Sequence, residues 1–179
     1  APYPLQLEAP TIADGRADQI AAMATLRDGL ADAGVGVDLV ADEWCDSRAD
    51  VEAFVDAGAA DLVQVKTPDV GRLLESGRAV EYCAGTDTRA YLGGTCNETT
   101  LSARASAHVG LATDAAQLLA KPGMGFAEGH AVVTHEMRRT LARHQWAQST
   151  DRTRGDTTAT HQQPAEQQKT MHHNQTEQP

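Results

Sequence analysis

The sequence has little of what nucleic-acid-binding, secreted or membrane-spanning proteins need. Its 15 Lys and Arg residues face 25 Asp and Glu, and a net charge of −10 argues against binding to phosphates. Its 3 cysteines are an odd number without a CxxC pair, which favours a reducing cytoplasm over disulfides. No apolar run approaches the roughly 20 residues of a membrane span, and residues 1–7 lack the charge pattern of a signal peptide. We therefore expect a cytoplasmic protein that binds neither nucleic acid nor a membrane.

Lysine is also scarce, whereas alanine is abundant and many acidic residues fall in helix-like stretches. Two interpretations of this composition stay open. The pattern resembles that of a salt-adapted protein, and it equally suits an ordinary acidic surface in contact with water.

The length of 179 residues indicates one domain. A complete (β/α)8 barrel needs about 250 residues, so this chain is too short to close one by itself. The chain also begins with Ala1 rather than Met. We expect the C-terminal part of a longer protein or a truncated gene product, with a small complete α/β domain as the alternative.

Apolar runs alternate with amphipathic stretches along the first 146 residues. The run at residues 37–41 is typical of a strand buried on both faces of a parallel sheet. Ile20, Met23 and Leu26 recur at helical spacing. The pattern predicts strands at 4–8, 37–41, 62–66, 90–92 and 117–120, and helices at 11–33, 47–57, 71–84, 100–116 and 128–144. This order implies a parallel α/β arrangement.

The composition changes after Trp146. Residues 147–179 are rich in Gln, Thr and His and have almost no aliphatic side chains. Such a segment buries too little apolar surface to offset the entropy of ordering it. The sequence therefore predicts a folded domain at 1–146 and a disordered polar tail at 147–179.

Chemically useful residues stand at the ends of four predicted strands. They are Glu8, Asp42, Lys66 and the pair Thr95 and Cys96, at steps of 34, 24 and 29 residues. Active groups at the C-terminal ends of successive strands are typical of (β/α)-barrel active sites. Two carboxylates followed by a lysine suggest metal-assisted proton abstraction.

Each of these residues has a chemical interpretation. Glu8 and Asp42 would supply oxygen ligands to Mg²⁺, while Glu43 should face away from Asp42 because neighbouring strand residues alternate. Lys66 shares a strand face with Gln64. A lysine inside a barrel beside a metal is expected to act as a base with a lowered pKa, although a lysine at a strand end can also extend to the surface.

The loop after the fourth predicted strand begins with Gly93 and Gly94, which let the backbone approach a ligand closely. Thr95 and Cys96 are then placed to donate hydrogen bonds to a carboxylate. The alternative is a plain loop that ends at a Thr99 helix cap. Lys121 stands at the end of the last predicted strand, where we expect a structural or loop role.

Four segments, VADEWCDS, LVQVKTPDVG, YLGGTCNET and LLAKPGMG, together resemble methylaspartate ammonia-lyase, a family of the enolase superfamily. The resemblance extends from about residue 4 to about residue 141 and does not include the tail. It implies an α/β fold, a partial (β/α) TIM-type barrel made of C-terminal strands and helices. It also implies the reversible elimination of ammonia from L-threo-3-methylaspartate to give mesaconate.

The resemblance assigns roles to particular residues. Lys66 corresponds to the base that removes the C3 proton, Glu8 and Asp42 to two of three Mg²⁺-binding carboxylates, and Gln64, Thr95 and Cys96 to substrate-binding positions. The third metal carboxylate, a catalytic histidine and a further glutamine have no counterpart in this chain. The full-length family members are expected to be homodimers that act on a small amino-acid substrate.

Two alternatives stay open. Another enolase-superfamily reaction, such as that of a racemase or dehydratase, is one, although the GGTCNET loop favours the ammonia-lyase. The other is a barrel fragment without activity. Because the expected metal site is incomplete, we expect the 179-residue chain alone to be inactive.

Overall fold

The computed structural model describes residues 4–119 and 121–159, and for residue 122 and residues 151–159 it describes the backbone alone. The chain divides into two compact units, of which the first ends at Arg139 and the second begins at Thr140. The strands and all helices but the end of the last one belong to the first unit. They are β1 Leu5–Glu8, α1 Arg16–Asp32, β2 Val37–Ala41, α2 Arg48–Asp56, β3 Leu62–Val65, α3 Thr67–Val70, α4 Leu73–Ala84, β4 Arg89–Leu92, α5 Thr100–Thr113, the 3₁₀ turn η1 Pro122–Met124 and α6 Phe126–Ala159.

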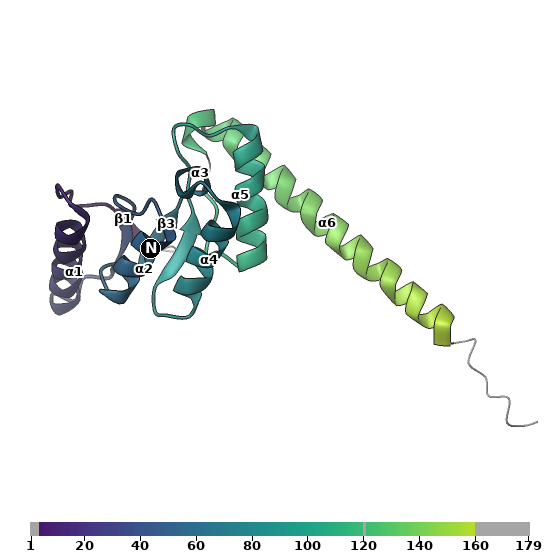
Figure 1. Cartoon of the computed structure of the whole chain (residues 1–179), viewed down its shortest axis with the longest axis horizontal. Helices are drawn as coiled ribbons and strands as arrows, with labels where there is room; N and C mark the ends of the chain where they lie inside the picture. The colour runs from purple at the N-terminus through teal and green to yellow at the C-terminus, as the bar shows by residue number, and fades with distance from the viewer. Residues whose placement is uncertain (1–3, 120, 160–179) are drawn as a thin grey trace, which may run out of the picture. The chain divides into compact units, whose positions relative to one another are not determined.

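The four strands form one parallel sheet in the order β1-β2-β3-β4 (Figure 1). Sequential parallel strands joined by helices are the repeating unit of (β/α) barrels. The predicted strand at 117–120 is present as one parallel bridge between Leu118 and Leu92. The backbone of Leu92 continues this pairing, because its N–H donates to Gln117 and its carbonyl accepts from Leu119. The prediction of a parallel α/β fold is confirmed.

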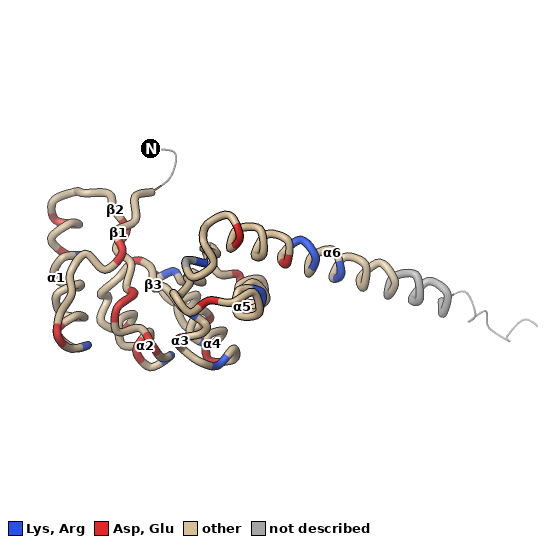
Figure 2. The backbone as a smooth tube through the Cα atoms, turned by 90° about the horizontal axis from the view of Figure 1, so that it is seen from above, with Lys and Arg blue, Asp and Glu red and all other residues tan. Residues whose placement is uncertain are grey.

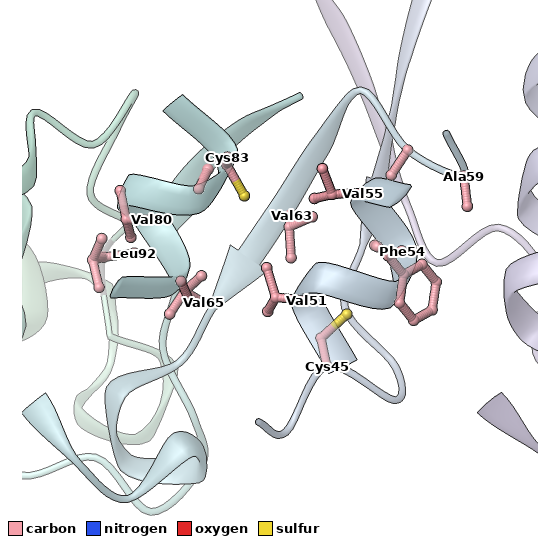
Figure 3. Packing of buried hydrophobic residues seen from close by; sticks show 14 of the residues in the cluster. Cys45, Val51, Phe54, Val55, Ala59, Val63, Val65, Val80, Cys83 and Leu92 are labelled. Atoms are coloured by element: carbon pink, nitrogen blue, oxygen red, sulfur yellow. The ribbon is translucent and has the colours of Figure 1, made fainter. Parts of the chain in front are cut away.

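One face of the sheet, called here the covered face, packs against helices. Val63 and Val65 of β3 lie between α2, with Val51 and Val55, and the neighbouring helix α4 (Figure 3). The cluster also includes Phe54, Val80, Cys83 and Leu92, and all of its members are buried. Burial of apolar area at roughly 25 cal/mol per Å² is the main stabilising contribution at such a face.

The helices begin where the sequence supplies caps. Ser47 accepts a hydrogen bond from the Asp50 N–H at the start of α2. Thr99 and Ser102 form a capping box at the start of α5, in which each side chain accepts from the other's backbone N–H. Such caps satisfy N–H groups that have no partner within the helix. Figure 2 shows acidic residues along α1 and α2.

Two segments differ from the sequence prediction. Thr67–Val70 forms the short helix α3, where only the end of a strand was expected. Pro68 stands at its first turn, where proline needs no N–H partner, and Gly71 ends it in the left-handed conformation.

The second difference is at the predicted tail. The helix α6 continues to Ala159, although residues 147–159 were assigned to a disordered segment. A helix already started in the first unit gains one hydrogen bond for each residue it adds, so it extends without apolar contacts. Residues 160–179 lie outside the described residues, and for them disorder stays a prediction. Within the part of the chain that the structure describes, no helix combines the length and apolar character needed to cross a bilayer.

Candidate active site

The second face of the sheet, called here the open face, carries the residues that the sequence singled out. Strand register pairs Glu8 with Val40, Val40 with Leu62, and Gln64 with Tyr91, so these side chains share one face. Val40, Leu62 and Tyr91 form a small buried cluster to which no helix contributes. Asp42 and Lys66 follow on the same face by the two-residue strand period. The open face is therefore a candidate site at the C-terminal edge of the sheet.

Lys66 and Asp42 meet at this edge. The Lys66 Nζ lies 2.7 Å from Asp42 Oδ1, and 3.9 Å from Asp69 Oδ2. Burial lowers the pKa of Lys66, but the hydrogen bond and charge of Asp42 outweigh this and leave the pKa above its ordinary value. The lowered pKa was expected for Lys66 beside a bound metal and stays a prediction, because here the expected metal ligand is itself the lysine's partner.

Glu8 and Tyr91 form the second pair of the open face. The Tyr91 hydroxyl donates to Glu8 Oε2 at 2.9 Å, across two intervening strands. Burial raises the pKa of Tyr91, and the negative charge of Glu8 adds to the rise, so the phenol keeps its proton. Tyr91 therefore fixes one carboxylate oxygen of Glu8 and leaves the other without this donor.

Gln64 is buried beside the end of β4. A Cβ added to Gly93 would lie 2.1 Å from Gln64 Oε1, a distance that no side chain can occupy. The absence of a side chain at position 93 therefore lets the Gln64 amide extend along the open face. The Gly93 N–H donates to Val65, which fixes the start of the following loop.

The loop of residues 93–98 carries Thr95 and Cys96, the predicted substrate-binding residues, and is called here the substrate loop after that prediction. Thr95 is buried, and its backbone N–H donates to Glu98 Oε2 at 3.3 Å. Its hydroxyl accepts from the Asn97 N–H at 3.5 Å. Cys96 is exposed. The structure thus places both side chains in the loop after β4, next to the strands that carry Lys66 and Gln64.

The two predicted metal ligands fit part of a hard-cation site. Carboxylate oxygens are the donors that Mg²⁺ prefers, and both carboxylates stand at the C-terminal ends of neighbouring strands. Among the described residues, no group of three or more His, Cys, Asp and Glu side chains is placed to hold a metal ion. Glu8 and Asp42 therefore fit as two ligands of a larger set. Glu43 is exposed, unlike the half-buried Asp42 beside it.

Sequence reasoning missed Tyr91 as a partner of Glu8, and for Lys121 it expected a structural or loop role without naming a partner. Lys121 is fully buried, and its Nζ donates to the Gly93 carbonyl. The two-residue strand period places Tyr91 on the same face as Gly93, so its position on the open face could have been predicted. The contact with Glu8 spans 83 residues, and no local pattern reveals it.

Comparisons with a family model and with known proteins identify the same family. The family model described as the C-terminus of methylaspartate ammonia-lyase matches residues 1–146. A methylaspartate ammonia-lyase from Haloarcula marismortui is 72% identical over 143 residues, which are 80% of this chain and 34% of that relative. The chain thus spans about a third of the length of the curated relatives it matches.

Solved structures show the same likeness. A magnesium complex of β-methylaspartase from Clostridium tetanomorphum has 46% identity and a TM-score of 0.73, covering 79% of this chain and 34% of that one. A methylaspartate ammonia-lyase from Citrobacter amalonaticus that contains (2S,3S)-3-methylaspartic acid has 46% identity and a TM-score of 0.76 at the same coverage. A dipeptide epimerase from Cytophaga hutchinsonii, at 20% identity and a TM-score of 0.57, shares the fold over 68% of this chain and 31% of that one.

Proposed function

Because this chain belongs to the methylaspartate ammonia-lyase family, we propose that it forms the C-terminal part of an enzyme that eliminates ammonia from L-threo-3-methylaspartate to give mesaconate. The observation that carries this proposal is the contact between Lys66 Nζ and Asp42 Oδ1 at 2.7 Å. It brings the predicted base and a metal-binding type of carboxylate together at the C-terminal edge of a parallel sheet. The Citrobacter relative contains 3-methylaspartic acid, which supports the same substrate here.

In this mechanism Lys66, in its neutral form, takes the proton from C3 of the substrate. The electron pair of the broken C–H bond forms the C2–C3 double bond, and the amine leaves C2 with its bonding pair. The C3 proton is only weakly acidic, although a carboxylate stands beside it. A group that stabilises negative charge on that carboxylate therefore lowers the barrier.

Glu8 and Asp42 would hold Mg²⁺, together with a third ligand from outside this chain. The magnesium complex of the Clostridium relative supports this choice of ion. When bound, the ion supplies positive charge for the carboxylate next to C3. The Tyr91 hydroxyl keeps Glu8 oriented toward the open face.

Gln64, Thr95 and Cys96 would orient the substrate. An amide, a hydroxyl and a thiol offer hydrogen bonds to the two carboxylates and the amine of an amino diacid. Gln64 and Thr95 are buried, so their positions are set before the substrate binds. Such fixed geometry brings the C3 proton and Lys66 together without further ordering.

The 179-residue chain alone would be inactive, because it offers two carboxylates for a site that needs more ligands. A homodimer in the cytoplasm is the arrangement that the family resemblance implies for the full-length protein. The odd cysteine count and the absence of a CxxC pair support the cytoplasm. The homodimer and the cytoplasmic location are both part of the proposal.

The test uses a fusion protein in which the N-terminal part of the Haloarcula marismortui relative precedes this chain. Lys66→Ala should lower the exchange of the C3 hydrogen with deuterated solvent by about 10²–10⁴-fold, the usual contribution of a general base. NMR of the substrate in D₂O measures this exchange. Exchange near the rate of the unchanged fusion protein would exclude Lys66 as the base.

A matched pair of carboxylates tests the metal ligand. Asp42→Asn should raise the Mg²⁺ concentration needed for half-maximal activity, whereas Glu43→Gln should have a smaller effect. The opposite ranking would assign the ligand to Glu43. Hydrogen exchange without mesaconate formation would instead point to a racemase-like reaction of the same superfamily.

A further inference from the structure

Lys121 lies in an environment that lysine rarely occupies. Its side chain has 0% exposure, and it donates a hydrogen bond to the carbonyl of Gly93, the first residue of the substrate loop. Lysine is almost never fully buried unless its charge is compensated. A residue that only fills space at this position would more simply be apolar, because burying an ammonium carries a desolvation cost.

Glu98 holds the opposite end of the same loop. It is 7% exposed, and its Oε2 accepts from the Thr95 N–H at 3.3 Å. Burial lowers the pKa of Lys121, and the negative charge of Glu98 opposes that shift. The two buried charges therefore stabilise each other while each binds a different point of the loop backbone.

Two glycines let the backbone of the Lys121 segment pack directly against its surroundings. A Cβ added to Gly123 would lie 2.6 Å from the Cys96 carbonyl oxygen and 3.0 Å from the Glu98 N–H nitrogen. A Cβ added to Gly129 would lie 2.6 Å from the Lys121 backbone nitrogen. A side chain at Gly123 would push the segment away from the substrate loop, and one at Gly129 would displace the backbone of Lys121 itself.

We propose that Lys121 is a positioning residue for the substrate loop: through the Gly93 carbonyl, and together with Glu98 at the Thr95 N–H, it fixes Thr95 and Cys96 relative to Lys66 so that they meet the carboxylates of the amino-acid substrate. The effect on catalysis rests on the proposed function. The effect on the loop does not, since it follows from the contacts alone.

The hydrogen bond from Lys121 to the Gly93 carbonyl depends on the charge of the ammonium group. The Gly93 carbonyl lies at the end of β4, where a buried acceptor without a donor is destabilised. A charged donor forms a bond about twice as strong as a neutral one. Lys121 thus holds the substrate loop at Gly93, directly after the end of β4.

The experiment replaces Lys121 with Met in the fusion protein, which keeps the length of the side chain and removes the donor. The KM for methylaspartate should rise by about tenfold or more, because a hydrogen bond to a charged group is lost from the structure that orders the loop. The Mg²⁺ concentration for half-maximal activity should stay within about twofold. Lys121→Gln restores a donor without the charge and should give an intermediate KM.

Hydrogen exchange followed by mass spectrometry tests the loop without turnover. Amides of residues 93–98 should exchange at least about tenfold faster in Lys121→Met, while those of β2 keep their rates. Ser76→Ala is the matched control, since Ser76 is also fully buried and donates to a carbonyl, that of Arg72 at the N-cap of α4. This control should lower the melting temperature without changing KM or exchange in the loop.

Two outcomes would overturn the inference. One is a lower melting temperature in Lys121→Met with unchanged KM and unchanged exchange at 93–98, which would make Lys121 a purely structural residue. The other is a rise in exchange that is uniform over the whole chain. If the fusion protein itself formed no mesaconate, the proposed function would fail, and the exchange measurement would still decide the role of Lys121.

Discussion

The covered and open faces of the sheet hold their side chains by different forces. On the covered face, β3 places only Val63 and Val65 against the apolar sides of α2 and α4. On the open face, charged and polar side chains bind one another across strands. The pairs are Lys66 with Asp42, Tyr91 with Glu8, and Arg89 with Asp38 at 2.6 Å.

The covered face therefore supplies stability, whereas the open face carries the residues of the proposed mechanism. The covered face is completed by helices of the same chain, so it can contribute its full burial energy. The open face satisfies its polar groups by pairing the very residues that the proposed mechanism uses. Its paired groups therefore contribute little net stability, since partly exposed ion pairs are typically worth about 0–1 kcal/mol.

The largest expected effect comes from the covered face. Phe54→Ala should lower the free energy of opening by about 3–5 kcal/mol, because the ring is fully buried and its removal leaves a cavity. Native-state hydrogen exchange of β3 amides in the fusion protein measures this loss.

Phe126 provides a control of the same residue type. It is 78% exposed at the start of α6. Phe126→Ala should stay within about 0.5 kcal/mol of the unchanged protein. If both substitutions cost the same, stability would not be concentrated at the covered face.

A smaller effect is expected on the open face. Tyr91→Phe removes the hydroxyl that donates to Glu8 and should weaken Mg²⁺ binding by about tenfold or more, as is usual for partners of metal ligands. Calorimetric titration of the fusion protein with Mg²⁺ measures the affinity. Tyr82→Phe is the control, since its hydroxyl donates to Asp56 on the helical side of the first unit. Equal loss of affinity in both variants would contradict the assigned role of Tyr91.

The smallest effect concerns a polar cluster that belongs to neither face. Glu136 of α6 is buried and accepts from Arg139, His108 and Arg104, which lower its pKa to about 2. A lowered folded-state pKa contributes stability that is present above the ordinary value and is lost as the pH falls toward 2. The melting temperature of the fusion protein should therefore fall between pH 4.5 and 2.

Glu136→Gln isolates this contribution. Gln cannot titrate, so the variant should lose less stability than the unchanged protein over the same pH interval. Parallel pH curves for the two proteins would show that other carboxylates dominate the acid response.

The sheet and its active edge were predictable because their signals are local. The apolar runs at β2 and β3 identify strands, and the two-residue period then places Gln64 and Lys66 on one face. The placement of Asp42 and Lys66 at the same edge follows from parallel neighbouring strands, although their ion pair was not predicted. The placement uses only spacing within a strand and the order of strands.

The rest depends on contacts that the local sequence does not contain. The helix α3 was missed because a proline after a strand was interpreted only as a stop. The end of α6 was missed because its composition lacks apolar residues, although helix propagation needs none. The contacts of Tyr91 with Glu8 and of Lys121 with Gly93 were missed because the partners are distant in sequence.

The close approach at Gly93 has a consequence for a directed-evolution experiment on this chain. In a library that randomises position 93, every variant would require the buried Gln64 side chain to move, because the first carbon of any new side chain would lie 2.1 Å from Gln64 Oε1. Three residues later, the Cys96 side chain is exposed. A library at position 96 with Gly93 kept constant therefore varies the same loop without displacing Gln64.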